Sequence, residues 1–253
     1  MKQLPKAVLV TGAARRIGRA IALDLAAEGW AVAVHYHGSP DDAEQTIQEI
    51  EAFDGRAVAV QADLSDGAEA ATLVTKATEK LGTPLTALIN NASVFDDDRL
   101  QDFTPAGWQN HMSVNLMAPA VLSQQFAAQR HGGATGNIIN MIDQRVLKLN
   151  PQYFSYTASK SALWTLTQTM AQALAPTIRV NAIGPGPTLA NTRQSAADFA
   201  AEAAKTPLEK GPALEEICRT VRFLLETPSI TGQMMALDGG QHLAWRTADI
   251  LEE

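Results

Sequence analysis

Short apolar runs alternate along the chain with segments in which apolar residues recur every three or four positions. The first run is Ala7–Val10, and after it Ile17, Ile21 and Leu25 fall on one face of a helix. We expect strands at residues 7–10, 31–36, 57–61, 87–90, 137–141, 178–183 and 234–237. We expect helices at residues 17–28, from residue 40 onward, and at 68–81, 104–129, 152–174 and 214–225.

The apolar runs do not alternate with polar residues, so these strands are expected to be buried on both faces. That pattern is typical of a parallel sheet covered by helices on both faces. The sequence predicts an α/β, doubly wound (Rossmann-type) fold, with residues 1–253 forming a single domain. Residues 186–211 follow a strand and read as an insert, either a lid over a site or a surface helix pair.

Composition narrows the class of protein. The 253 residues include one cysteine, Cys218, so no intrachain disulfide can form, and a reducing cytoplasm is the expected location. No apolar run approaches the ~18 residues needed to cross a bilayer. The formal charge of −7 argues against a nucleic-acid partner, whose binding surface would be basic.

The turn after the first strand is a candidate phosphate site. It runs from Thr11 to Gly18, between a strand and a helix whose amide groups and dipole favour an anion. Gly12 and Gly18 allow a tight turn and close approach of a ligand, and Arg16 and Ile17 lie between them. The alternative is an ordinary turn between strand and helix.

The segment after the second strand indicates the nicotinamide cofactor. Folds that bind NAD place an acidic residue there to bind the ribose 2′-hydroxyl, and this chain has none. Instead, four residues that could meet a 2′-phosphate follow, together with the earlier Arg15: His35, Tyr36, His37 and Ser39. We therefore expect NADP(H), although His35 and His37 could be ordinary strand-end residues.

Asp63 and the remaining histidines are the other polar candidates for a site. Asp63, after the third strand, could accept a hydrogen bond from the adenine amino group or could cap a helix. The remaining histidines show no short ligand spacing with one another or with Cys218, so we expect no metal site.

Tyr156 and Lys160 form the candidate chemical centre. They are four residues apart at the start of a predicted helix, so they share one face. An ammonium near a phenol favours the phenolate, and we therefore expect Lys160 to lower the pKa of Tyr156 and make it a proton donor.

Together these motifs resemble the short-chain dehydrogenase/reductase family over essentially the whole chain. The motifs are the Thr11–Gly18 turn, Asn90-Asn91-Ala92, Asn115, the Tyr156/Lys160 pair and Pro185-Gly186. The resemblance implies a nicotinamide cofactor, Tyr156 as acid, Lys160 on the ribose, Asn115 in a proton relay, and a homotetramer. It also implies further cofactor contacts from Leu64, Asn91, Ala92, Ser93, Met141, Pro185, Gly186 and Thr188.

Two departures from the family pattern narrow the resemblance. Arg16 stands where the family's turn usually has a glycine, and Asp143 stands where its catalytic serine is expected. Within the family, the pteridine reductases share both features, and bacterial dihydromonapterin reductases are similar. They also share the segments that here read His35-Tyr36-His37-Gly38-Ser39 and Asn91-Ala92-Ser93-Val94-Phe95.

These substitutions suit the reduction of a ring C=N bond. Asp143 could resupply a proton to Tyr156 if burial raised its pKa. Phe95 could stack on a flat heteroaromatic ring, while Arg16 and Ser93 could hydrogen-bond its edge. Each of these residues has a plainer alternative. Phe95 could be a packing residue, Arg16 could bind only a phosphate, and Asp143 could cap the loop that precedes Tyr156.

The sequence thus predicts an NADPH-dependent reductase of a small-molecule pterin. The alternatives are a carbonyl reductase of ketoacyl or sugar substrates with an atypical Asp143, and a non-catalytic NADP-binding sensor. Trp245 is expected either to contact a neighbouring subunit's site or to pack in a subunit interface.

Overall fold

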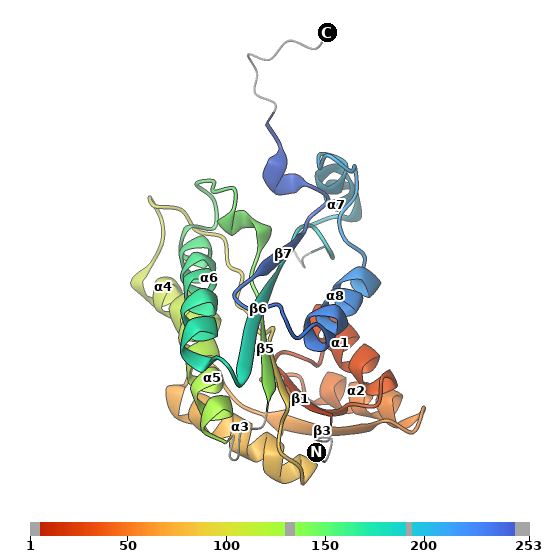
Figure 1. The fold of residues 1–253 in the computed structure, drawn as a ribbon. Coiled ribbons are helices and arrows are strands. Elements are labelled where there is room, and N and C mark those ends of the chain that lie inside the picture. The colour runs from red at the N-terminus through yellow and green to blue at the C-terminus, as the bar shows by residue number, and fades with distance from the viewer. Residues whose placement is uncertain (1–5, 130–134, 191–193, 246–253) are drawn as a thin grey trace.

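Seven parallel strands form one sheet in a computed structural model that describes residues 6–129, 135–190 and 194–245. The strand order is β3-β2-β1-β4-β5-β6-β7 (Figure 1). Strands β2 and β3 are added on one side of β1, and β4 to β7 are added on the other side. The strands are β1 (Ala7–Val10), β2 (Ala31–Tyr36), β3 (Arg56–Gln61), β4 (Ala87–Asn90), β5 (Gly136–Met141), β6 (Ile178–Pro185) and β7 (Met234–Leu237). This architecture confirms the predicted fold class.

Helices cover both faces of the sheet (Figure 1). One face packs against α1 (Arg16–Ala27), α2 (Pro40–Glu51) and α8 (Leu214–Glu226). The other packs against α3 (Gly67–Leu81), α5 (Ala118–Ala128) and α6 (Phe154–Leu174), with α4 (Pro105–Met112) beside α6. Every residue of β1 and β4 is buried, as their uninterrupted apolar runs predicted.

The helical region expected at residues 104–129 is divided. A π-helical stretch, Ser113–Met117, lies between α4 and α5 and contains the buried Asn115. Such stretches are frequent at functional sites. Helix α6 begins at Phe154, two residues later than expected, because Tyr153 adopts a left-handed backbone conformation with a φ of 53°. The Phe154 amide donates to the carbonyl of Asp98 at 3.1 Å.

The insert after β6 contains a short helix, α7 (Ala196–Ala203), none of whose residues is buried. Its C-terminal side is fixed by Thr206, whose hydroxyl accepts from the Lys210 amide at 3.1 Å. The Leu208 amide donates to the carbonyl of Gly239 at 2.9 Å, which joins this segment to the turn after β7. Residues 191–193 of the predicted lid lie outside the described residues.

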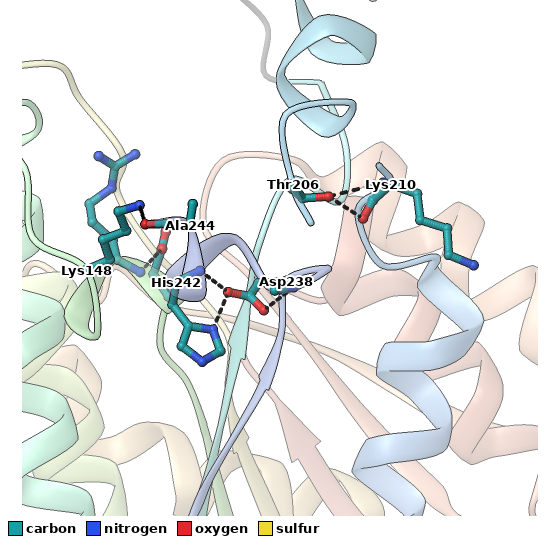
Figure 2. A network of polar contacts seen from close by, with 9 residues as sticks. Lys148, Thr206, Lys210, Asp238, His242 and Ala244 are labelled. Atoms are coloured by element: carbon teal, nitrogen blue, oxygen red, sulfur yellow. Dashed lines mark hydrogen bonds and ion pairs between the residues drawn. The ribbon is translucent and has the colours of Figure 1, made fainter. Parts of the chain in front are cut away.

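The turn after β7 is organised by the buried carboxylate of Asp238 (Figure 2). Asp238 accepts from the amides of Gly240 and His242, and from the His242 ring at 2.6 Å. Lys148, in the loop after β5, donates to the carbonyl of Ala244. Three loops that are distant in sequence therefore meet above the carboxyl ends of β5, β6 and β7.

No helix within the described ranges is long and apolar enough to cross a membrane.

Candidate active site

The turn between β1 and α1 is locked onto the end of β4. The Asn91 side chain donates to the carbonyl of Thr11 at 2.8 Å, and the Ala92 amide donates to the Thr11 hydroxyl at 2.9 Å. Gly12 has a φ of +62°, and a Cβ on Gly18 would lie 2.2 Å from the Gly12 carbonyl oxygen. The turn therefore requires glycine at both positions, and it lies where the strand order reverses, the usual ligand site of such folds.

Arg16 occupies a left-handed backbone conformation, with a φ of 55°. An arginine there costs about 1 kcal/mol relative to glycine, which explains why glycine would be usual at this position. Its guanidinium donates to the carbonyls of Leu189 at 3.1 Å and Ala190 at 2.8 Å. Arg16 therefore connects the cofactor turn to the segment after β6.

His35 does not face a cofactor phosphate, contrary to one of our sequence-based expectations. Its ring is buried, and its Nδ1 accepts from the Gly12 amide at 2.9 Å. Its Nε2 lies 3.2 Å from the Ala62 carbonyl, so this nitrogen carries the proton. Burial lowers the pKa of His35 to about 4, and the neutral ring supports the turn from behind.

The exposed groups beside the end of β2 are Arg15 and His37. Arg15 is paired with Asp42, with a Nε–Oδ2 distance of 2.6 Å, and His37 Nδ1 lies 3.3 Å from the Asp63 carboxylate. Asp63 also accepts from the amide and hydroxyl of Ser65, and these hydrogen bonds lower its pKa. Asp63 thus caps a tight turn, while Asp66 caps helix α3.

The other residues expected at the cofactor surround this turn. Tyr36 packs against the core, Ser39 occupies the N-terminal cap position of α2, and Leu64 is buried. Six more line one large cavity over the carboxyl ends of the strands: Ile17, Asn91, Met141, Pro185, Gly186 and Thr188.

Tyr156 and Asp143 form the chemical centre of that cavity. The Tyr156 hydroxyl donates to Asp143 Oδ2 at 3.0 Å, and Asp143 Oδ1 accepts from the Arg145 amide at 2.8 Å. Asp143 therefore both caps the short helix at residues 144–146 and contacts the candidate acid. Lys160, 2% exposed, donates to the Met141 carbonyl at 2.8 Å, and its Nζ lies 5.7 Å from the centre of the Tyr156 ring.

Burial controls the ionisation of all three groups. Burial and the neighbouring Asp143 raise the pKa of Tyr156 well above its usual value, which corrects our expectation that Lys160 would lower it. Burial also raises the pKa of Asp143, as a proton-supplying role requires. Burial lowers the pKa of Lys160 to about 8, against the opposing effect of Asp143. Tyr156 is therefore held as a neutral phenol that can donate a proton.

Asn115 holds the loop after β4. Its amide nitrogen donates to the Val94 carbonyl at 3.0 Å and to the Ser159 hydroxyl at 3.1 Å. Its oxygen accepts from the Val94 amide at 2.8 Å and from the Ser93 hydroxyl at 3.2 Å. In this structure the Asn115 side chain acts on the loop that carries Ser93 and Phe95.

The cavity has a volume of about 640 Å³, enough for a nicotinamide and a small ring. Phe95 lines it and stacks on Tyr153, with ring centres 4.3 Å apart, and meets the edge of Tyr156 at 4.7 Å. The Arg145 guanidinium lies over the Tyr153 ring, 4.9 Å from its centre. One wall of the cavity is therefore aromatic and beside the candidate acid.

Several lining residues were missed by sequence reasoning, namely Asp97, Gln152, Tyr153, Gln194, Asp198, Phe199, Glu202 and Gln241. They come from loops and from α7, which have no periodic pattern. Tyr153 alone carried a signal, because an aromatic residue three positions before Tyr156 lies near it at a helix start. Among the described residues, no group of three or more His, Cys, Asp or Glu side chains could hold a metal ion.

Comparison with known proteins places this geometry among dehydrogenases. Residues 6–201 match the family described as short chain dehydrogenase. The crystal structure of FolM alternative dihydrofolate reductase 1 from Brucella suis, in complex with NADP, is 50% identical in sequence. It has a TM-score of 0.94, and the match covers 98% of this chain and 99% of that chain.

More distant relatives act on other substrates. The 3-oxoacyl-[acyl-carrier-protein] reductase of Staphylococcus epidermidis is 33% identical over 243 residues, which cover 94% of this chain and 99% of that protein. The structure of angucycline C-6 ketoreductase LanV with bound NADP is 30% identical, with a TM-score of 0.86, and covers 94% of this chain and 96% of that one.

Proposed function

The chain belongs to the short-chain dehydrogenase family and is an NADP-dependent oxidoreductase, and from this premise we propose that it reduces a dihydropterin to the tetrahydropterin. The observation that carries the proposal is the pair of Asp143 and Tyr156, 3.0 Å apart in a cavity with an aromatic wall. The 50% identity to a structure described as an alternative dihydrofolate reductase supports it.

NADPH is the cofactor, and the residues present fit it. Gly12 and Gly18 leave no room for side chains in the turn, as close approach of a pyrophosphate requires. Arg15 and His37 lie exposed at the end of β2, where a 2′-phosphate would replace part of their pairing with Asp42 and Asp63. Lys160 would hold the nicotinamide ribose. When bound, the cofactor supplies the hydride to a ring carbon.

Tyr156 donates its hydroxyl proton to the ring nitrogen next to that carbon, and Asp143 restores the proton to Tyr156. The hydride and one proton together saturate the C=N bond. Asp143 suits this role because burial raises its pKa, so that it holds a proton at higher pH than an exposed carboxyl. A serine in its place could hydrogen-bond a carbonyl but could not supply a proton.

Phe95, Ser93 and Arg16 bind the substrate ring in this proposal. The Phe95 ring contacts the edge of Tyr156 and so would hold a flat ring beside the acid. The Arg16 guanidinium would release the carbonyl of Leu189 or Ala190 and donate instead to the edge of the substrate ring or to a cofactor phosphate. Ser93 would hydrogen-bond the opposite edge.

A carbonyl substrate is the second candidate, because ketoacyl and angucycline reductases are 33% and 30% identical to this chain. In that case Asp143 would stand in for a serine, and the reaction would need neither its carboxyl group nor the aromatic wall. A non-catalytic NADP-binding sensor would have no need of the Tyr156–Asp143 contact or of the buried Lys160.

The deciding measurement is NADPH oxidation with dihydrobiopterin, dihydromonapterin and dihydrofolate, beside a panel of ketones and a ketoacyl thioester, with NADH as the cofactor control. We expect rapid turnover of a dihydropterin with NADPH. Turnover of ketones alone would replace the pterin assignment by carbonyl reduction, and tight NADPH binding without turnover of any substrate would support a sensor.

The role of Asp143 is tested by Asp143→Ser. We expect pterin turnover to fall by about 10²–10⁴-fold, the usual contribution of a positioned proton donor, with NADPH affinity little changed. The matched control is Asp24→Ser, since Asp24 is an acid on α1 whose pKa burial also raises. Equal loss of turnover and of cofactor binding in Asp143→Ser would make Asp143 structural.

We further propose that the enzyme is a homotetramer and works in the cytoplasm. The tetramer rests on the family resemblance, and the location rests on the single cysteine, Cys218, which is buried and unpaired.

A further inference from the structure

The loop after β4 presents alternate residues to the cavity. Its odd-numbered residues line the cavity: Ser93, Phe95 and Asp97. Its even-numbered residues are bonded to the protein behind it: Val94, Asp96 and Asp98. Alternation of this kind means that whatever holds the even residues also sets the direction of the odd ones.

Three anchors hold the even residues. Val94 exchanges two hydrogen bonds with the Asn115 side chain. The Asp96 amide donates to His111 Nε2 at 3.2 Å. Asp98 caps helix α6, since its carboxylate accepts from the Ser155 amide at 3.0 Å and from the Ser155 hydroxyl.

The second and third anchors are joined by a short chain of buried polar groups. His111 Nδ1 lies 2.7 Å from the Ser155 hydroxyl oxygen, and that hydroxyl contacts Asp98 Oδ2. His111 is 1% exposed and Ser155 is fully buried. An unpaired polar group at either position would cost about 1–3 kcal/mol, so the direction of each bond is constrained.

The proton positions in this chain follow from its ends. An amide can only donate, so the Asp96 amide requires His111 Nε2 to be unprotonated, which leaves the proton on Nδ1. A carboxylate can only accept, so Ser155 gives its single proton to Asp98 and accepts from His111. Burial lowers the pKa of His111 and Lys160 lowers it further, against the charges of Asp98 and Asp96 and a backbone hydrogen bond with Gly107. The net shift favours the neutral ring.

We propose that His111 and Ser155 are positioning residues for the substrate ring. The one-directional chain from His111 through Ser155 to Asp98 fixes the Asp96 amide, which follows Phe95, and the start of α6, where Tyr153 stacks on Phe95. It thereby sets the direction of Phe95. The role of Phe95 in binding a pterin ring rests on the proposed function, whereas the hydrogen-bond chain itself does not.

The chain is tested first in the ligand-free enzyme by long-range ¹H–¹⁵N correlation spectra of its five histidines. We expect His111 as the Nδ1–H tautomer and His35 as the Nε2–H tautomer, with His111 assigned by its loss in His111→Gln. We expect Ser155→Ala to weaken the preference for the Nδ1–H form. An Nε2–H tautomer at His111 in the wild-type enzyme would overturn the inference.

The effect on substrate binding is tested with Ser155→Ala against Thr167→Val. Thr167 is buried on the same helix, and its hydroxyl donates to the Leu163 carbonyl and accepts from Asn140 at 2.8 Å. We expect Ser155→Ala to raise the KM for the dihydropterin by about tenfold, the equivalent of one hydrogen bond, with NADPH affinity unchanged. Thr167→Val should lower thermal stability comparably and leave KM alone.

Equal KM values in the two variants would overturn the positioning role. Absence of pterin turnover in the wild-type enzyme would instead contradict the proposed function. The KM comparison would then be made with the substrate that the panel identifies, and the tautomer measurement would stand independently.

Discussion

Asp143 and Lys160 are buried ionisable groups on either side of Tyr156, and burial moves their pKa values in opposite directions. The raised pKa of Asp143 favours its neutral acid, and the lowered pKa of Lys160 favours its neutral amine. Both shifts weaken charge beside the phenol. The site therefore loses folding free energy by burying two groups whose pKa values lie closer to neutral pH than those of exposed counterparts.

We expect pterin turnover to fall as pH rises through the raised pKa of Asp143. The carboxyl must hold a proton to restore Tyr156, and the protonated fraction decreases through that range. Asp143→Asn should lose this pH dependence and show a low, flat rate. The measurement is kcat against pH for both proteins at saturating NADPH, and the same falling limb in Asp143→Asn would assign it to another group.

Lys160→Met should stabilise the ligand-free enzyme while abolishing turnover. The folded-state pKa of about 8 lies below the ordinary 10.5, so the folded chain binds the proton less tightly. That penalty is complete below pH 8 and disappears as pH rises to 10.5. Its upper limit is about 3 kcal/mol. Urea unfolding across this pH range measures it.

The control for Lys160→Met is Lys80→Met. Lys80 is exposed and, like Lys160, donates to a backbone carbonyl, that of Ala59, at 2.8 Å. It should give no gain in the free energy of unfolding. A gain in Lys160→Met that persists above pH 10.5 would mean that packing, and not charge, is responsible.

Among the elements, the turn after β7 shows how closely the substrate-side segments approach each other. A Cβ on Gly239 would lie 2.1 Å from the Lys210 carbonyl oxygen, whereas a Cβ on Gly29 would meet nothing within 4 Å. Both glycines have a positive φ, so alanine costs each about 1 kcal/mol of backbone strain. We expect Gly239→Ala also to displace residues 206–210 and raise the substrate KM.

The comparison of Gly239→Ala with Gly29→Ala separates the cost of backbone strain from the cost of the contact with the Lys210 carbonyl. Thermal unfolding should show a smaller loss in Gly29→Ala, and its KM should equal that of the wild-type enzyme. If both variants lose equal stability and neither changes KM, the contact between Gly239 and Lys210 does not support the cavity.

Sequence periodicity predicts a helix or strand where burial of its apolar residues determines its bounds. The strands at residues 31–36, 87–90 and 234–237 have the expected bounds because a continuous apolar run can be buried only within the sheet. The division of residues 104–129 by a π-helical stretch was not foreseen. Within the insert at residues 186–211, a surface helix pair was one of two expectations, but the bounds of helix α7 were not predicted, because α7 buries no residue.

The candidate site was partly predictable for a related reason. Tyr156 and Lys160 were identified from their local spacing and Asp143 from the family resemblance, and the structure brings the three together. The role of His35 was misjudged because strand-end position does not reveal which way a ring faces. The chain from His111 to Asp98 joins residues 44 and 57 positions apart through Ser155, and no local pattern records such a contact.

At the scale of the whole molecule, large apolar side chains gather on the surface near the C-terminal turn. Leu149, Leu243 and Trp245 are each more than 60% exposed. Lys148 and Ala244 are hydrogen-bonded, so these segments are neighbours. A surface of this kind usually contacts another protein, and a second copy of the chain fits the proposed tetramer.

We expect Trp245→Asp to reduce the assembly below four copies of the 27.0 kDa chain. Light scattering coupled to size-exclusion chromatography measures the mass. Phe53→Asp is the control, because Phe53 is also exposed but lies near the start of β3, at the other end of the sheet. A monomeric wild-type protein, or an unchanged mass in Trp245→Asp, would contradict this expectation.

The meeting of three loops at Asp238 has a consequence for biosynthesis. A ribosome completes Tyr156, Lys160 and the cofactor turn well before it reaches β7 and the turn after it. Until that turn emerges, Lys148 lacks the carbonyl of Ala244 and Leu208 lacks that of Gly239. A nascent chain can therefore assemble most of its sheet and the turn between β1 and α1 while the segments after β5 and β6 still lack the hydrogen bonds that fix them, so the cavity is completed only late in translation.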